Sequence, residues 1–186
     1  HILRQRGYRC LVVDHLHTWN LKQIKSLLDR AVGANTKLLG FHTTFFMDTN
    51  VNPEPGKPTI FRRLDQNSHV CPQGAEFESE MLDHARSLNP TIKFSVGGSN
   101  TNRVDFSNKR FDFALVGYSE NSIIWLMDHL SGGGRLPQSF ANDHGIMIVD
   151  DREARGYDFE KDDMAWLPED VIETRVLPIE CARGCV

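Results

Sequence analysis

Apolar residues along the chain form short continuous runs separated by stripes at helical spacing. The runs cover residues 10–14, 37–41, 92–96 and 111–116, and each is typical of a strand buried in a parallel sheet. Apolar residues between the runs recur every three or four positions, which predicts helices. These stripes are Leu21, Ile24, Leu27, Leu28 and Ala31; Phe77, Met81, Ala85 and Leu88; and Ile123, Leu126, Met127 and Leu130.

Residues that start and stop helices flank these stripes. Asn20, followed three positions later by Gln23, predicts a capping box before the first stripe. Asn89-Pro90 predicts the end of the second helix, and the glycines at 132–134 predict the end of the third. Residues 1–9 read as the end of a further helix, closed by Gly7.

Strand and helix therefore alternate three times, which predicts the α/β class. We expect a doubly wound, Rossmann- or flavodoxin-like parallel sheet with helices on both faces. Ligands of such folds bind where the carboxyl ends of the strands meet. The segments expected at this edge are Thr43 and Thr44, the long irregular stretch from Met47 to Ala75, Gly97-Gly98-Ser99, and Gly117-Tyr118-Ser119-Glu120.

The alternation stops after residue 135, and the charge changes soon afterwards. Ile146 to Val149 fits a short strand, but residues 143–173 carry 3 Lys and Arg against 11 Asp and Glu. We predict an α/β domain at 1–135 and an extended acidic linker at 136–175. An acidic arm that docks on another module of the same protein is the alternative.

Composition excludes several classes of protein. No run approaches the roughly 18 apolar residues of a membrane span, and 4 cysteines among 186 residues are too few for a disulfide scaffold. Nucleic-acid binders normally carry a basic stripe, and the acidic segment argues against one. The N-terminal stretch lacks the long apolar region of a secretory signal, so the expected location is the cytoplasm.

The two glycine-containing loops each allow two interpretations. Glycines at 97–98 let a planar or phosphate-bearing ligand approach the backbone, with Ser99 as a hydroxyl donor, but a turn with positive φ also needs glycine. In the loop at 117–121, Tyr118 and Glu120 would face a bound cofactor, whereas Ser119 or Asn121 would simply cap the next helix.

Other chemistry-bearing residues give weaker patterns. Asp14, His15 and His17 follow a predicted strand and fit either a metal site or a turn. No glycine pattern of a nucleophile elbow supports Ser–His–Asp chemistry. Cys181 and Cys185 near the end of the chain fit two free thiols or half of a zinc site.

The residues around Cys185 favour another interpretation. Glu180, Arg183, Gly184 and Cys185 resemble the Glu-x-x-Arg-Gly-Cys strand that opens the CxxxCxxC motif of radical S-adenosylmethionine enzymes. In that family three thiolates hold a 4Fe–4S cluster, which binds S-adenosylmethionine. The resemblance makes Cys185 the first cluster ligand and residues 176–186 the first strand of a radical S-adenosylmethionine domain. Cys181 stands where the family usually has Ser or Thr, so it is not assigned as a ligand.

Residues 1–135 resemble the cobalamin-binding domain that often precedes such a domain. The resemblance rests on a strand ending in Gly97-Gly98 and on a Phe-Asp-x-x-x-x-Gly-x-x-Glu pattern from Phe111 to Glu120. It implies that Thr43, Thr44 and Ser99 donate to the corrin amides or the nucleotide tail, and that Gly97, Gly98 and Gly117 let the ring or tail lie against backbone. The Asp-x-His-x-x-Gly signature of a lower cobalt ligand is absent.

The resemblance implies a function for the parent enzyme rather than for this chain alone. The cluster would generate a radical from S-adenosylmethionine, and methylcobalamin would deliver a methyl group to an unknown substrate. The chain begins at His1 and ends just after Cys185, so we expect a fragment whose partner is the radical S-adenosylmethionine domain of the same protein. The alternatives are a domain of that family without cobalamin, a methylthio-transferring relative, or a free-standing flavodoxin-like binding module.

Overall fold

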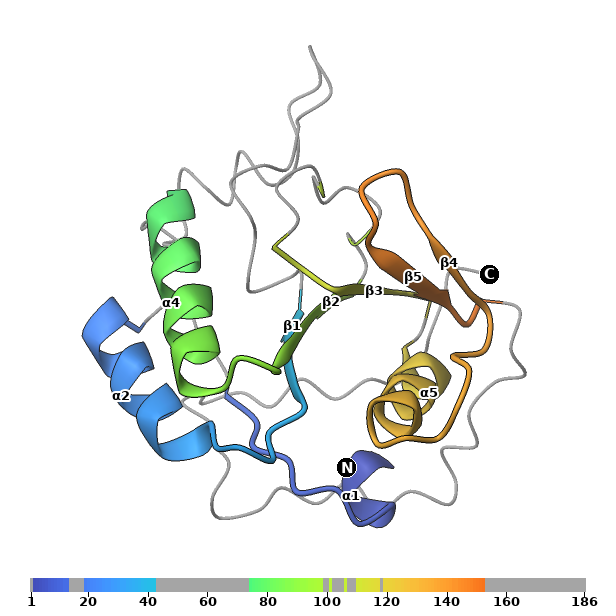
Figure 1. Cartoon of the computed structure of the whole chain (residues 1–186), viewed down its shortest axis with the longest axis horizontal. Coiled ribbons are helices and arrows are strands. Elements are labelled where there is room, and N and C mark those ends of the chain that lie inside the picture. Colours follow the sequence, from blue (N-terminus) through green and yellow to red (C-terminus); the bar gives the residue numbers. More distant parts are fainter. Residues whose placement is uncertain are drawn as a thin grey trace, which may run out of the picture.

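The chain forms an α/β structure around one sheet (Figure 1). The computed structural model describes residues 2–13, 19–42, 74–98, 101, 106, 110–117 and 119–152. Its helices are α1 (Ile2–Gln5), α2 (Leu21–Ala31), α4 (Gly74–Leu88) and α5 (Glu120–Leu130), and its strands are β1 (Leu38–His42), β2 (Lys93–Gly97), β3 (Phe113–Val116), β4 (Ser139–Ala141) and β5 (Met147–Asp150).

The five strands lie in the order β1-β2-β3-β5-β4. β1, β2, β3 and β5 are parallel, and β4 pairs with β5 in the antiparallel direction at one edge. Phe41 stands opposite Val96, and Val96 stands opposite Ala114. This mostly parallel sheet confirms the predicted α/β class.

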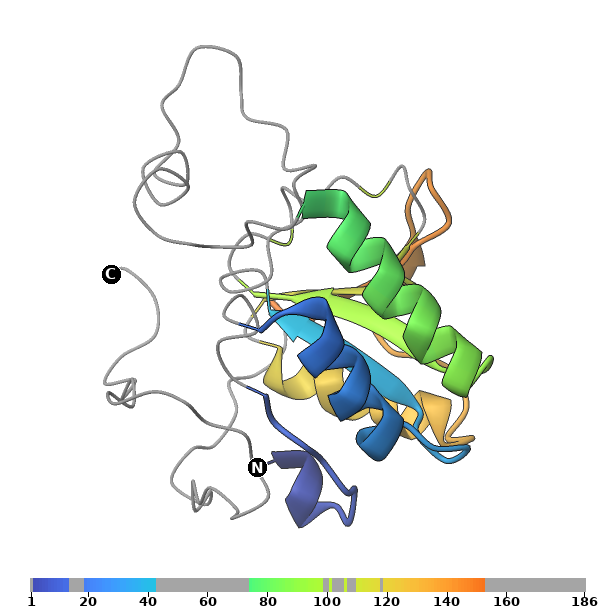
Figure 2. The same cartoon turned by 90° about the vertical axis from the view of Figure 1, so that its left-hand side faces the viewer.

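Side chains alternate between the two faces of the sheet, and each face has its own core. One face presents Phe94, Val96 and Ala114 to α2 and α4, which lie side by side (Figure 2). The opposite face presents Leu115 and Val149 to α5. Because successive strand residues point to opposite faces, nearly continuous apolar runs fill both cores. The prediction of helices on both faces is confirmed.

The helix boundaries follow the expected capping residues. The Asn20 side chain accepts a hydrogen bond from Gln23 N, and the Gln23 side chain accepts one from Asn20 N, each at 2.9 Å. This is the predicted capping box of α2. Gly7, with φ of +82°, follows α1, and Asn89 follows α4 directly.

The first predicted strand does not form. Residues 10–13 include one isolated bridge residue, Val13, and belong to none of the five sheet strands. Leu11 is 41 % exposed, whereas a strand inside a parallel sheet is covered on both faces. The prediction of a buried strand at 10–14 is therefore wrong for the described residues 10–13. The reason is that a short apolar run does not specify which strand it would pair with.

The sheet extends past residue 135, where the sequence predicts the α/β domain to end. β5 pairs with β3 through Ala114 opposite Ile148 and Leu115 opposite Val149, and β4 covers the outer edge of β5. The apolar residues at 146–149 complete both cores, although the net charge of the surrounding sequence is acidic. Residues 153–186, including most of the predicted linker, lie outside the described residues.

Two helical connections between parallel strands lie on opposite faces of the sheet, although both move the chain in the same direction along the strand order. The chain passes from β1 to β2 through α4 on one face and from β3 to β5 through α5 on the other. Two such crossovers have opposite hands, so one of them departs from the usual right-handed rule. The order of the four described parallel strands shows no reversal, so a ligand site has to be sought along the whole carboxyl edge.

Candidate functional site at the carboxyl edge of the sheet

The carboxyl ends of the four parallel strands meet at one edge of the sheet. His42 at the end of β1 stands opposite Gly97 at the end of β2, and Gly97 stands opposite Leu115 of β3. Val116 at the end of β3 stands opposite Asp150 at the end of β5. The loops that follow these four residues therefore leave the sheet side by side.

Five of the predicted binding residues are described, and all five stand at or just after a strand end on this edge. They are Gly97, Gly98, Gly117, Ser119 and Glu120. The remaining candidates lie outside the described residues, and their roles stay predictions: Thr43, Thr44, Ser99, Tyr118, Cys185 and the weaker group of Asp14, His15 and His17.

Gly98 begins a tight turn after β2. Its φ is +112°, in the region that favours glycine. The backbone N–H of Thr101 donates to the Gly98 carbonyl oxygen at 3.1 Å, and the Thr101 hydroxyl donates to the same oxygen at 2.8 Å. Thr101 is buried. The turn therefore accounts for Gly98, as the simpler of the two sequence interpretations expects.

Gly97 is not required by the backbone in the same way. It is not among the residues with positive φ. A β-carbon built on it would lie 3.4 Å from the Leu115 β-carbon and 3.7 Å from the Ser119 hydroxyl oxygen. The backbone of β2 thus ends between His42 and Leu115 with no side chain of its own, and Ser119 supplies the nearest hydroxyl group.

Gly117 faces a carboxylate. Its φ is +105°, and a β-carbon built on it would lie 2.1 Å from Oδ1 of Asp151 and 3.0 Å from the backbone nitrogen of Arg152. Asp151 follows β5 directly, and its backbone N–H donates to the Val116 carbonyl oxygen at 3.1 Å. The absence of a side chain at Gly117 is therefore what lets the carboxylate of Asp151 pack against the end of β3.

The N-terminus of α5 is capped by Asp151. Ser119, one of the two capping residues that the sequence suggested, occupies the N-cap position, but its φ is +70° and its side chain makes no capping bond. Oδ2 of Asp151 instead accepts from the backbone N–H of Ser122 at 3.2 Å and lies 3.4 Å from the Ser122 hydroxyl oxygen. A carboxylate here satisfies a free N–H group and complements the helix dipole.

A second carboxylate lies in the first turn of α5. Glu120 is 8 % exposed and Asp151 is 3 % exposed, so two acidic side chains are buried where β3, β5 and α5 meet. By contrast, the neighbouring Asp150 accepts from Nε of the exposed Arg152 at 2.9 and 3.0 Å. Arg152 lowers the pKa of Asp150 below the usual value, chiefly through this hydrogen bonding.

His42 and Asp151 are edge residues that motif reasoning missed. Burial lowers the pKa of the His42 imidazole below its ordinary value, which favours the neutral ring at neutral pH. Neither residue belongs to a recognisable motif. His42 ends the apolar run that forms β1, and Asp151 directly follows the run that forms β5. This position at a strand end is the signal in the sequence that could have identified them.

Metal ligands do not gather at this edge in the described structure. Within the part of the chain that the structure describes, no three His, Cys, Asp or Glu side chains lie close enough to hold a metal ion. The Cys10 thiol donates to the Tyr8 carbonyl oxygen at 3.8 Å. Among the same residues, none of the helices combines the length and apolar character needed to cross a bilayer.

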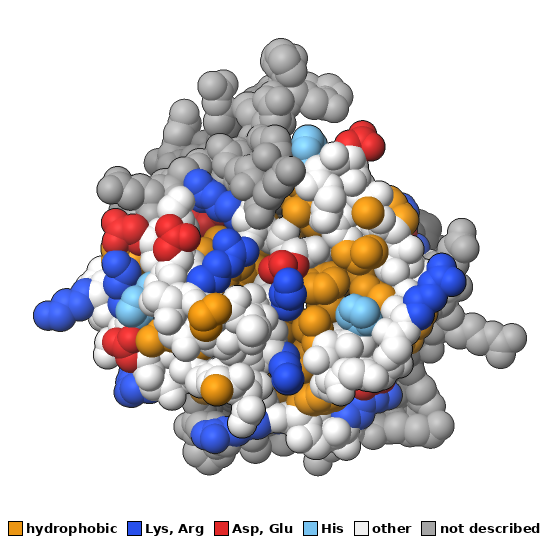
Figure 3. Space-filling model, viewed as in Figure 1, with side chains coloured by type: hydrophobic (Ala, Val, Ile, Leu, Met, Phe, Trp, Pro, Cys, Tyr) orange, Lys and Arg blue, Asp and Glu red, His pale blue; other side chains and the backbone are white. Residues whose placement is uncertain are grey.

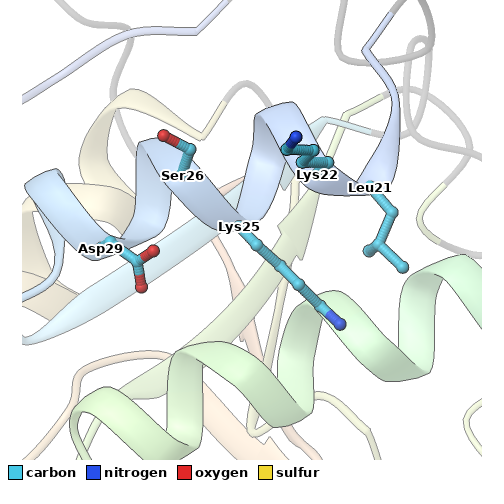
Figure 4. A pocket seen from close by; sticks show the side chains of 5 residues that line it. All are labelled: Leu21, Lys22, Lys25, Ser26 and Asp29. Carbon is cyan, nitrogen blue, oxygen red and sulfur yellow. The ribbon is translucent and has the colours of Figure 1, made fainter.

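A separate shallow hollow of about 570 Å³ lies along α2 (Figure 4). Two of its residues bridge to α4: Lys25 Nζ lies 2.7 Å from Glu80 Oε2, and Asp29 Oδ1 lies 2.8 Å from His84 Nε2. These pairs account for two of the three charged residues there; Lys22 is the third. Basic, acidic and hydrophobic side chains are interspersed on the face seen in Figure 3. The hollow is lined by Leu21, Lys22, Lys25, Ser26 and Asp29.

Comparison with family models, with curated proteins and with solved structures gives no match to this chain. The functional assignment therefore depends on the residues themselves.

Proposed function

We propose that this chain is the cofactor-binding part of a radical S-adenosylmethionine enzyme and that its α/β domain holds a cobalamin-type cofactor at the carboxyl edge. The observation that carries the proposal is the sequence from Glu180 to Cys185, read together with Gly97 and Gly117 at neighbouring strand ends. The enzyme activity belongs to the parent protein, which would transfer a methyl group to a substrate of unknown chemistry.

The described residues fit a cofactor of this kind. The corrin ring is flat and carries neutral carboxamide groups around its rim. Gly97 offers backbone without a side chain, Ser119 offers a hydroxyl group beside it, and Asp151 brings a buried acceptor oxygen to the same edge. These residues would hold the ring and its carboxamides, together with Thr43, Thr44, Ser99 and Tyr118 as predicted from the sequence.

Each protein group has a defined task in this proposal. The cofactors supply methyl-group and radical chemistry when bound. Gly97 admits the ring to the backbone, and burial keeps the imidazole of His42, which stands opposite Gly97, in its neutral form. Cys185 would supply the first thiolate to a 4Fe–4S cluster. Such a thiolate needs a reducing compartment, so we also propose a cytoplasmic location.

A direct binding experiment tests the cobalamin site. The 186-residue chain is incubated with hydroxocobalamin, desalted, and its visible spectrum recorded. We expect corrin absorbance to elute with the protein at a ratio near one to one. A matched Gly97→Val variant fills the backbone surface at the end of β2, and we expect at least about a tenfold loss of affinity. Absence of corrin absorbance after desalting would exclude cobalamin binding and leave a domain of that family without the cofactor.

A sequence observation tests the radical S-adenosylmethionine assignment separately. The family motif requires cysteines four and seven residues after Cys185. We expect both when the gene is sequenced past the codon for Val186. Their absence would remove the assignment and favour a free-standing flavodoxin-like binding module, in which Cys181 and Cys185 are incidental.

A further inference from the structure

The N-terminus of α5 is the position at which a parallel α/β sheet commonly binds a ligand phosphate. Free backbone N–H groups and the helix dipole both attract an anion there. α5 has 11 residues and begins directly after the Gly117 loop. In this chain the side chain at the N-cap, Ser119, makes no capping bond, so it does not occupy the position where an anion would bind.

The protein's own carboxylate takes this position. Asp151 reaches it from the end of β5 and binds Ser122 through Oδ2 at 3.2 Å from the backbone nitrogen. Asp151 is 3 % exposed, and the side-chain-free Gly117 makes the space for it. Three chain segments that are distant in sequence thus combine to seat one carboxylate at the helix N-terminus.

The other oxygen of the same carboxylate has no hydrogen-bond partner among the described residues. Oδ1 of Asp151 is fully buried, and an ionised carboxylate can only accept hydrogen bonds. A buried acceptor without a donor costs about 1–3 kcal/mol. A ligand N–H or O–H that reaches Oδ1 recovers this cost, whereas a phosphate oxygen is repelled by the carboxylate of Asp151.

We propose that Asp151 determines ligand specificity at this edge: it fills the anion position of α5, so that the surface over Gly117 excludes a phosphate and accepts a neutral hydrogen-bond donor such as a carboxamide. Applied to the carboxamides of a corrin, the preference for a neutral donor refines the proposed function and rests on it. The exclusion of anions rests only on the contacts of Asp151 and stands independently of the cofactor.

Inorganic phosphate tests the exclusion in the wild-type chain. The Ser122 backbone amide resonance is followed by NMR during a phosphate titration. We expect it to stay in place, because the amide is already bound to Asp151. A saturable shift of this resonance in the wild-type protein would overturn the proposal. This measurement does not depend on the folding of any variant.

Removal of the Asp151 carboxylate tests whether the N-terminus of α5 is an anion-binding position. In Asp151→Ala the N-terminus of α5 loses its anion, and we expect about 20 mM formate or phosphate to raise the Tm of the variant by about 2–4 °C. The same additions leave the wild type and Asp150→Asn unchanged, because both keep Asp151. A folded Asp151→Ala protein that responds to neither anion would overturn the proposal.

Hydroxocobalamin tests the donor preference. Asp151→Asn keeps an oxygen for Ser122 but places an NH₂ group where Oδ1 was, so a ligand donor meets another donor. We expect at least a tenfold rise in Kd, while the control Asp150→Asn stays within about twofold. An unchanged Kd in Asp151→Asn would contradict the donor preference. If the wild type itself binds no cobalamin, the proposed function fails and the two anion experiments alone decide this inference.

Discussion

Nη1 of Arg110 lies 3.0 Å from Oε1 of Glu78, and this ion pair ties the segment before β3 to helix α4. The Glu78 side chain is only 3 % exposed, so its carboxylate depends on protein partners. Removal of one partner of a buried ion pair leaves a charge that neither water nor protein fully compensates, which is strongly destabilising.

Arg110→Met is therefore expected to lower the free energy of unfolding by about 3 kcal/mol and Tm by about 6–12 °C. Calorimetry or urea unfolding measures the change. Lys25→Met is the control, because Lys25 and Glu80 form a pair that is partly exposed at both ends, and it should cost less than about 1 kcal/mol. The double variant Glu78→Gln/Arg110→Met should recover part of the loss. Equal effects of the two single substitutions would contradict a buried role for Glu78.

The close approach of Asp151 to Gly117 gives a second prediction. Gly117→Ala adds backbone strain at a φ of +105° and a clash with Oδ1 of Asp151, whereas Gly132→Ala adds similar strain at +95° with nothing within 4 Å. Strain alone costs about 1–3 kcal/mol. We expect Gly117→Ala to be less stable than Gly132→Ala by at least about 2 kcal/mol. Thermal unfolding of the two variants side by side measures the difference, and equal Tm values would show that the carboxylate can move away.

Much of the fold was predictable because the sequence pattern and the structure have the same period. Continuous apolar runs marked β1, β2 and β3, and the spacing of Ile24, Leu27 and Leu28 marked α2. The pairing of Asn20 with Gln23 fixed where that helix begins. Local patterns do not determine which strand lies beside which, so the failure of residues 10–13 to join the sheet was not predictable.

The candidate site was predictable only as far as its glycines. Gly97, Gly98 and Gly117 stand where the pattern placed them, at strand ends on one edge. Their physical roles came from distant parts of the chain: Thr101 closes the turn at Gly98, and Asp151 packs on Gly117. Asp151 lies in a region whose high acidity suggested a linker, so its burial at the helix N-terminus had no local signal beyond its place after an apolar run.

A buried amide network joins two loops at the opposite edge of the sheet and gives a third prediction. Nδ2 of Asn89 donates to the carbonyl oxygens of Gly33 and Thr36 at 3.0 and 2.8 Å, and Oδ1 accepts from Thr91. Asn89 is buried. Asn89→Ala leaves several buried groups without partners, and we expect a loss of about 2–4 kcal/mol.

Asn20→Ala is the matched control for Asn89→Ala. It removes an exposed cap from α2 and should cost about 1 kcal/mol. Urea unfolding curves of the two variants provide the comparison. If Asn20→Ala proved the more destabilising of the two, the cap rather than the buried network would be the main support of this region.

The lowered pKa of His42 predicts a loss of stability on the acid side of neutrality. Burial of the imidazole disfavours its charged form, so the unfolded chain binds this proton more readily than the folded protein does. The stabilising contribution is therefore present above the ordinary value of 6.5 and is lost as the pH falls from there toward the lower pKa of the folded state. His42→Gln removes the titrating group, and its stability should fall less than that of the wild type between pH 7 and pH 5. Urea unfolding at both pH values measures this difference, and NMR titration of the His42 ring is the direct check. A His42 ring that titrates above 6.5 in the folded protein would reverse the expected sign.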